Sequence, residues 1–382
     1  MVNFKTRIFF ILLALLFIQS FALAEKTSVL LIDKDFSLVR CKKEITLAKG
    51  ENLVTFGPVG KGVVVESVYP EIEGCQVLEQ KIVPPSVLVW KVNSAIEDTT
   101  YLDVSYLTKG ISWSVNYKIN LDSEEKSFSF TCFLTVENRD GGDFALCELG
   151  FLSPIEFFQN IEKDNTQQTQ AGFPPECNVK VEEDKERIIY FLTKEVNLPQ
   201  DEVKTFFLFS FPKISTEKVY FFDGEKYGDE VREELHFKNP SGVFFPEGKL
   251  YIYKTTSGGR KVYLGERELG QIPPGREASI YLGPAKGIIG YRVQTFYKEV
   301  ELTPVEKDIY NKDIAREYEY RLVFSNMRPD PVKIKVVEHF YGWWKIIESE
   351  PESYEKREKE IIYYLELPPN SKKIIRYKAR TI

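Results

Sequence analysis

Apolar and polar residues alternate along much of this chain. From Trp113 to Leu121 every second residue is apolar, and the same holds from Phe128 to Val136. A period of two turns one face of a strand toward a core and the other toward water. The pattern therefore predicts two neighbouring β-strands, each half-buried.

The two predicted strands are followed by a cluster of turn-forming residues, Asn138-Arg139-Asp140-Gly141-Gly142. We expect the chain to reverse about Asp140-Gly141 and to pair residues 127–137 with 144–151. Cys132 and Cys147 would then be diagonal neighbours on the buried face, slightly too far apart for a disulfide without a bulge. Buried free thiols are favoured over a disulfide there. The odd number of cysteines leaves at least one unpaired or bonded between chains; they are Cys41, Cys75, Cys132, Cys147 and Cys177.

The C-terminal part of the chain alternates in the same way. Strands are predicted over residues 317–324, 332–336 and 361–367, with a last strand beginning at 375. The stretches 229–235 and 352–360 suit a short helix or a loop equally well. Aromatic residues, at 14%, are dominated by 28 Phe and 21 Tyr, which suit strands. The predicted fold is all-β, with tandem antiparallel β-sandwich modules and few or no helices.

A short pattern recurs three times along the chain. Val136-Glu137-Asn138, Phe237-Lys238-Asn239 and Phe324-Ser325-Asn326 each end an alternating strand with Asn before a turn. This indicates repeated sandwich-like modules. Since Asn is common where a strand meets a turn, coincidence is the alternative.

The first residues have the features of a secretory signal. Lys5 and Arg7 precede the apolar run Ile8 to Ile18, and Ala22-Leu23-Ala24 is a small-x-small cleavage site. We expect cleavage between Ala24 and Glu25, which makes the protein periplasmic or secreted. The alternative is a retained anchor, but the apolar run is shorter than the ~20 residues that span a bilayer. We expect a soluble mature chain with no transmembrane segment.

Four parts of the chain follow from these features: a signal peptide (1–24), an N-terminal β-domain (25–100), a central β-domain or domains (101–300) and a C-terminal β-sandwich (301–382). Within the central part, residues 157–178 include a polar, Gln-rich stretch and Pro174-Pro175. That composition lacks periodicity and predicts a long mobile loop.

The charge of the chain argues against nucleic acid as a partner. It carries 51 basic and 57 acidic residues, a formal net charge of −6, and loss of the signal would remove two of the basic ones. Proteins that bind nucleic acid usually show a basic footprint. Many Lys and Glu residues beside only two Met and two His resemble the composition of heat-adapted proteins.

No recognisable catalytic motif or cofactor-binding motif occurs in the sequence, and we expect no catalytic, cofactor or metal site. Asp140 and Asp143 flank two glycines, which is typical of a tight turn rather than a calcium loop. The cluster Phe340-Tyr341-Gly342-Trp343-Trp344 has two interpretations. Trp343 and Trp344 could form a sugar-stacking platform, but adjacent aromatics on a strand more often divide between core and surface.

Several motifs resemble those of domain-of-unknown-function family 4139, which includes mucoidy inhibitor A-like proteins. The segment from Tyr106 through Gly110 and Trp113 to Tyr117 looks like its Tyr-x-x-x-Gly-x-x-Trp-x-x-x-Tyr signature. The segment from Val136 to Phe144 is similar to its Asn-x-(Ser/Thr)-Gly-x-(aromatic) turn. Phe245-Pro246-Glu247-Gly248 resembles its Leu-Pro-x-Gly strand. The resemblance runs from about Val29 to Tyr377.

The resemblance implies no activity and no catalytic residues. Many members carry a coiled coil that is missing here between Val63 and Thr100, so this chain resembles a branch that lacks it. Alternation places Trp113 and Tyr117 on a buried face, where a structural role is expected, as for Gly110, Asn138 and Gly141. The expected function is a binding or scaffolding module of the cell envelope, with an envelope protein or polysaccharide as partner. The alternative is an envelope enzyme that acts on polysaccharide or cell-wall material.

Overall fold

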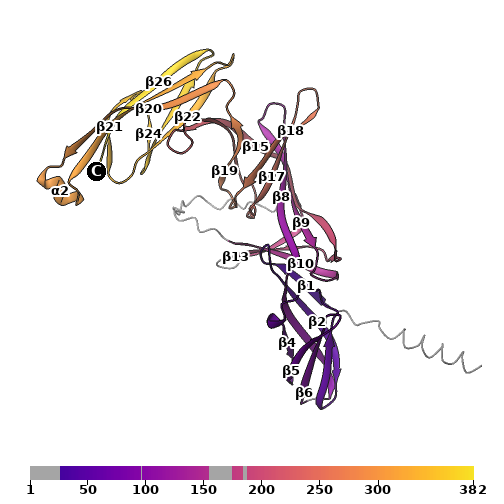
Figure 1. Ribbon diagram of the computed structural model, residues 1–382. Helices are drawn as coiled ribbons and strands as arrows, with labels where there is room; N and C mark the ends of the chain where they lie inside the picture. Colours follow the sequence, from indigo (N-terminus) through magenta and orange to yellow (C-terminus); the bar gives the residue numbers. More distant parts are fainter. Residues whose placement is uncertain (1–25, 96, 155–173, 184–186) are drawn as a thin grey trace, which may run out of the picture. The chain divides into compact units, whose positions relative to one another are not determined.

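The computed structural model describes residues 26–95, 97–154, 174–183 and 187–382, which fall into two compact units (Figure 1). Unit 1 comprises Met1–Tyr117, Thr131–Phe211 and Pro246–Lys249, and unit 2 comprises Lys118–Phe130, Pro212–Phe245 and Leu250–Ile382. The predicted signal segment, with Ala24 and Glu25, lies outside the described residues. So does most of the predicted loop 157–178, whose described end contains a two-residue strand.

The chain is all-β, as the alternation predicts. Among the described residues the helical elements are the 3-10 turn η1 (Val65–Ser67) and α2 (Pro304–Tyr310). No helix in this part of the chain has the length and apolar character needed to cross a membrane.

An eight-stranded sheet belongs to unit 1. Its order is β12-β13-β10-β1-β2-β7-β4, with β14 beside β10. β1 and β10 run parallel, and the other pairs are antiparallel. The strands are β1 (Lys26–Leu31), β2 (Ser37–Leu47), β4 (Tyr69–Ile72), β7 (Asp98–Thr108), β10 (Phe144–Pro154), β12 (Val179–Glu183), β13 (Arg187–Leu192) and β14 (Val196–Leu198).

A three-stranded sheet of unit 1 has the order β3-β6-β5. Its strands are β3 (Gly50–Phe56), β5 (Cys75–Val83) and β6 (Val87–Ser94). In the central strand, Leu88, Trp90 and Val92 are fully buried, while the intervening Val89 and Lys91 are partly exposed. The sheet therefore has an inner face in a core and an outer face toward solvent.

An eleven-stranded sheet follows the order β18-β17-β8-β9-β15-β22-β25-β24; β11 pairs with β15, and β16 pairs with β15 and β19. β8, β9 and β15 each supply one segment to unit 1 and another to unit 2. The strands are β8 (Ile111–Leu121), β9 (Ser127–Asn138), β11 (Glu176–Cys177), β15 (Glu202–Asp223), β16 (Val231–Lys238), β17 (Gly248–Thr255), β18 (Lys261–Leu269), β19 (Glu277–Pro284), β22 (Val332–His339), β24 (Glu355–Lys356) and β25 (Glu360–Leu367).

A four-stranded sheet of unit 2 has the order β20-β21-β26-β23 (Figure 1). A core of aromatic and aliphatic side chains joins β21 and β26 of this sheet to β22 and β25, with Phe222, Phe324 and Tyr363 among its largest members. The strands of the sheet are β20 (Ile288–Glu301), β21 (Ile314–Asn326), β23 (Trp344–Glu350) and β26 (Ser371–Thr381). The predicted C-terminal strands correspond to β21, β22, β25 and β26.

The predicted hairpin about Asp140-Gly141 is wrong. β9 pairs with β8 and β15, whereas β10 lies in the eight-stranded sheet beside β1. The reason is the path of the turn. A Cβ atom on Gly60 would lie 2.2 Å from the carbonyl carbon of Gly141, so the two glycine segments touch backbone to backbone. This contact takes the chain out of β9 into a different sheet.

The two stretches for which a helix or a loop was expected also differ. Residues 231–235 of the first begin strand β16, and the second contains the short strand β24. All five cysteines are free thiols, and Cys41, Cys132 and Cys147 are buried. The preference for buried free cysteines is therefore confirmed for Cys132 and Cys147, although they do not face each other across a hairpin.

Candidate binding surface

The residues of the family-like signature hold the structure of unit 1 together. Tyr117 is fully buried, its hydroxyl donates to the carbonyl oxygen of Pro246 at 2.5 Å, and burial raises the pKa of this phenol well above its usual value. Gly110 has φ +82°, and a Cβ there would lie 2.6 Å from the side chain of Asp140. At Gly141 an added Cβ would lie 2.4 Å from Ile111. These positions need glycine because the neighbouring segments leave no space.

Trp113 is half-buried rather than buried, which corrects the prediction from alternation. Its indole nitrogen donates to the carbonyl oxygen of Asp33 at 2.8 Å, and its ring lies 5.3 Å from that of Phe151. Alternation assigns a face, but it does not determine how completely neighbouring segments cover that face. The role of Trp113 is still structural, since it ties the β1–β2 loop to β8.

The three recurring asparagines, Asn138, Asn239 and Asn326, make the same pattern of hydrogen bonds, which is called the asparagine device. Each asparagine is almost fully buried. Each side-chain amide donates to the backbone carbonyl of the residue four positions further on. It also donates to the backbone carbonyl of a residue that directly precedes a proline distant in the sequence. The donor bonds are Asn138 to Gly142 (2.7 Å) and Leu198 (3.0 Å), Asn239 to Val243 (2.9 Å) and Ile272 (3.0 Å), and Asn326 to Asp330 (2.9 Å) and Leu367 (3.3 Å). The sequence echo therefore reflects a repeated structure and not coincidence.

The same asparagines also organise their own turns. The side-chain oxygen accepts a backbone N–H from Gly141, Ser241 or Arg328 at 3.0–3.1 Å. Both the nitrogen and the oxygen of each side-chain amide are thus hydrogen-bonded within the protein, and neither is available to a ligand. The asparagine device explains the fold of three turns and does not constitute a site.

The adjacent tryptophans divide between surface and core, as the structural alternative predicts. Trp343 is 40% exposed and lies against Tyr310, with ring centroids 5.5 Å apart. Trp344 is buried and stacks on Phe340 at 4.4 Å. The two rings therefore do not form a joint sugar-stacking platform.

Unit 2 contains a buried group of charged side chains. Glu338, 1% exposed, accepts bonds from Arg292 at 2.8 and 3.1 Å and from the hydroxyl of Tyr377. Burial raises the pKa of Glu338 against the opposing effect of Arg292. Nearby on the same strand, His339 Nε2 lies 2.8 Å from an Asp223 carboxylate oxygen. These carboxylates face partners within the protein.

Two hollows lie on unit 1. One, of about 380 Å³, is lined mainly by residues 56–60 and 141–145, and Asp143 is its one carboxylate-bearing lining residue. That carboxylate accepts the backbone N–H of Gln200, 57 residues further along the chain, at 2.7 Å. Within the part of the chain that the structure describes, no group of three or more His, Cys, Asp or Glu side chains could hold a metal ion.

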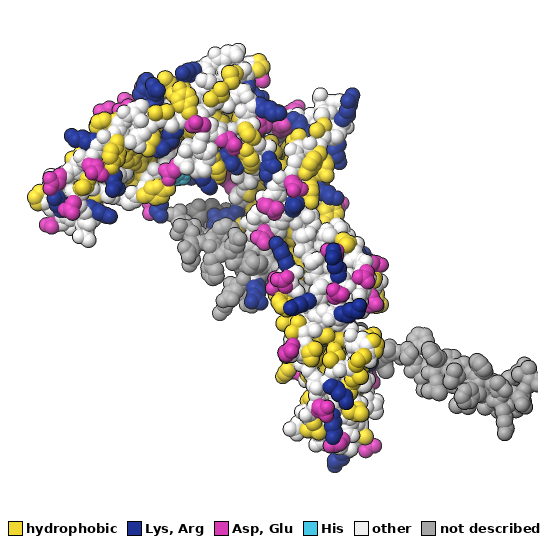
Figure 2. Space-filling model, in the orientation of Figure 1, with side chains coloured by type: hydrophobic (Ala, Val, Ile, Leu, Met, Phe, Trp, Pro, Cys, Tyr) yellow, Lys and Arg dark blue, Asp and Glu magenta, His cyan; other side chains and the backbone are white. Residues whose placement is uncertain are grey.

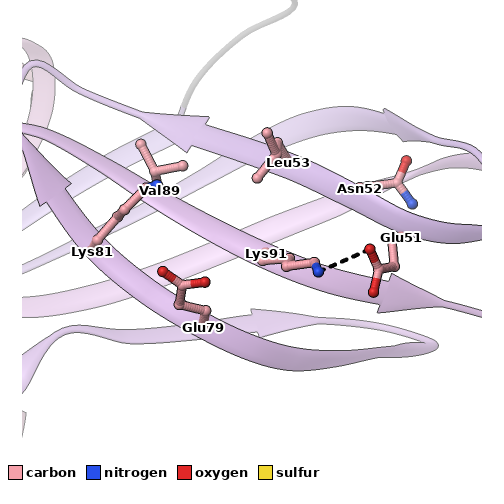
Figure 3. A pocket seen from close by; sticks show the side chains of 7 residues that line it. All are labelled: Glu51, Asn52, Leu53, Glu79, Lys81, Val89 and Lys91. Carbon is pink, nitrogen blue, oxygen red and sulfur yellow. Dashed lines mark ion pairs between the residues drawn. The ribbon is translucent and has the colours of Figure 1, made fainter.

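The other hollow, of about 570 Å³, lies on the outer face of the three-stranded sheet (Figure 3). The Lys91 ammonium lies 2.9 Å from a Glu51 carboxylate oxygen, and this hydrogen bond and charge raise the pKa of Lys91. Two carboxylates and two ammonium groups balance each other around apolar side chains. The lining residues are Glu51, Asn52, Leu53, Glu79, Lys81, Val89 and Lys91.

Exposed apolar residues occur in this hollow and along β5, where Val77 and Ile82 pair with the inward-facing Val92 and Leu88. Leu53 is 71% exposed, and Val77, Leu78, Ile82 and Val83 on β5 are each 38–47% exposed. Figure 2 shows apolar side chains interspersed with charged ones on the face of unit 1 in view. Sequence reasoning missed these residues, although the run of apolar residues on both sides of Glu79-Gln80-Lys81 was a visible signal.

β5 is also an edge strand. It pairs with β6 on one side, and no further strand pairs with it among the described residues. Its outward backbone N–H and C=O groups are the kind of edge to which a further strand can add. The sheet face, the hollow and the β5 edge together are named the β5 surface.

The comparison with known families agrees with the sequence resemblance. The model of the domain of unknown function DUF4139 matches residues 102–381. No curated protein matches the chain. The matched region contains the signature residues Gly110, Trp113, Tyr117, Asn138 and Gly141, whose structural contacts are described above. The chain belongs to the DUF4139 family.

Proposed function

We propose that the protein is exported and acts as a binding or scaffolding module of the cell envelope, using the β5 surface. The observation that carries this proposal is the combination of an open strand edge with exposed apolar residues on β5. Monomeric proteins usually protect such edges, and an exposed one offers main-chain hydrogen bonds to an extended partner. The signal-like N-terminus supports the location.

The chemistry of the surface favours a protein partner over a charged polysaccharide. The two carboxylates and two ammonium groups that line the hollow cancel, so the surface has no strong field of either sign. Apolar side chains between them suit a segment of mixed polarity. The alternative, an enzyme acting on polysaccharide, needs carboxylates free to act on a substrate. Glu338 and Asp223 are buried and engaged with Arg292 and His339, and in the open hollow Glu51 is paired with Lys91.

Photo-crosslinking in the native host tests this proposal. A photoreactive amino acid at Leu53 should yield discrete crosslinked envelope proteins, which mass spectrometry identifies. The matched control is Leu146, which is 64% exposed and also belongs to unit 1 but lies away from the β5 surface. Crosslinks that are absent from both positions, or identical for both, would contradict the proposal.

A further inference from the structure

We infer that β5 pairs with β5 of a second copy of this chain, antiparallel and related by a two-fold axis at Gln80. This rests on the proposed function, because it assigns a partner to the edge of the β5 surface. A two-fold pairing joins the same strand of both copies, so each residue faces its mirror position about the axis. Two three-stranded sheets would become one sheet of six strands.

The sequence of β5 is complementary to itself about Gln80. In this register Glu79 faces Lys81 of the second copy, and the symmetry produces that pair twice. Opposite charges across strands are favourable, so both neighbours of Gln80 on β5 have a suitable partner.

Neighbouring symmetric registers lack this complementarity. An axis at Glu79 would place that carboxylate opposite itself, and an axis at Lys81 would place two ammonium groups opposite each other. Like charges directly opposite are destabilising. The charge pattern therefore favours the axis at Gln80 over an axis at either neighbouring residue.

The sheet geometry agrees with this register. Glu79 and Lys81 pair with Lys91 and Val89 of β6 and lie on the outer face, where Figure 3 shows both side chains beside the hollow. Gln80 points to the inner face, where its side-chain oxygen accepts the indole N–H of Trp90 at 2.6 Å. Since this bond holds the Gln80 side chain on the inner face, Gln80 would not contact the charged pairs on the outer face.

Two features of β5 also occur in strand edges that avoid pairing, namely a lysine and a bulge. The bulge lies between Val77 and Glu79 and leaves Leu78 without a partner in β6. The charged pairs lie in residues 79–83, which keep a regular register with β6. Lys81 would disfavour an uncharged strand, but Glu79 of a second copy neutralises it. Lys81 thus opposes pairing with most strands and favours pairing with β5 of a second copy.

Charge-swap variants of the mature protein, measured by sedimentation equilibrium at micromolar concentration, test the inference. Wild type should have twice the mass of one chain. Glu79→Lys and Lys81→Glu each place like charges opposite each other and should sediment as monomers. The double variant Glu79→Lys/Lys81→Glu restores opposite charges and should dimerise again, and a mixture of the two single variants should form a heterodimer. Both side chains lie at the surface, and a wild-type-like far-UV circular dichroism spectrum shows that the variants fold.

A monomeric wild type would overturn the inference, and so would single variants that stay dimeric or a double variant that stays monomeric. The outcome is distinguishable from that of the proposed function. A monomer that still gives envelope crosslinks from Leu53 retains the function and loses the two-fold pairing. A dimer with the expected charge dependence but without such crosslinks retains the two-fold pairing and loses the proposed function.

Discussion

Replacement of Asn239 by Asp would test the repeated asparagine device directly. The substitution keeps the shape and the side-chain oxygen that accepts the Ser241 backbone N–H at 3.0 Å, but it removes both N–H donors. Those donors serve the carbonyl oxygens of Val243 at 2.9 Å and Ile272 at 3.0 Å. An ionised carboxylate would instead face two carbonyl oxygens in a site that is 1% exposed.

The expected cost follows from these contacts. Two lost hydrogen bonds contribute about 1–3 kcal/mol together. Burial of a carboxylate near carbonyl oxygens adds to this, and partial protonation limits the addition. The carbonyl of Ile272 keeps the Phe245 N–H as a donor, whereas the single hydroxyl hydrogen of Ser241 is shared between the Val243 carbonyl and the side-chain oxygen at position 239. We therefore expect Asn239→Asp to lower the free energy of unfolding by about 2–4 kcal/mol at pH 7.

Urea unfolding of wild type and variant measures this difference from the transition midpoint and slope. The pH dependence gives a second test. Burial would raise the pKa of the new carboxyl in the folded state above its unfolded value, so the folded state would take up the proton first. The loss of stability should thus shrink as the pH falls from 7 toward the unfolded carboxyl pKa.

Asn178→Asp, at an exposed position, is the matched control for the added charge. It should change the free energy of unfolding by less than about 0.5 kcal/mol. If Asn239→Asp costs no more than this control, or if its cost is independent of pH, the asparagine device does not stabilise the turn as described.

Three further predictions concern other parts of the chain. Trp113→Ala should lower the free energy of unfolding by about 2–4 kcal/mol, since a half-buried ring and the bond to Asp33 are lost; unchanged urea unfolding would show that the ring contributes nothing. Burial opposes ionisation of Glu125, but Lys218 at 2.7 Å and a second lysine outweigh it and lower the pKa of that carboxyl. Its stabilising effect is present above the unfolded-state pKa and is lost as the pH falls through the folded one, so Glu125→Gln should lower the melting temperature at pH 7 and match wild type in acid. Mass spectrometry of the exported protein should find Glu25 at its N-terminus, and an intact signal segment would contradict this.

Local alternation predicted the strands well and their partners poorly. β9 is buried at every second residue from end to end, as its sequence predicts. The same pattern gave no reason to choose β15 rather than β10 as its neighbour. Turn-forming residues indicate only that a strand ends. The direction of the chain after Asn138 depends on the close contact of Gly141 with Gly60, which is distant in the sequence.

The repeated asparagines show the opposite case, in which a weak sequence signal has a strong structural meaning. Asn before a turn is common, so the echo alone could not distinguish repetition from chance. The bonds from Asn138 to Leu198 and from Asn326 to Leu367 span 60 and 41 residues, and such partners are invisible to a local pattern.

The sequence by itself determined the all-β fold, the family and the positions of most strands, because the side-chain period of a strand is a local property of the chain. The tertiary structure decided which strands form edges, how completely Trp113 is covered and which carboxylates are buried. These are properties of neighbours brought together over long distances in sequence. The β5 surface belongs to this second kind, since Glu79 and Lys81 become parts of a surface only because β6 lies on one side of β5 and no described strand lies on the other.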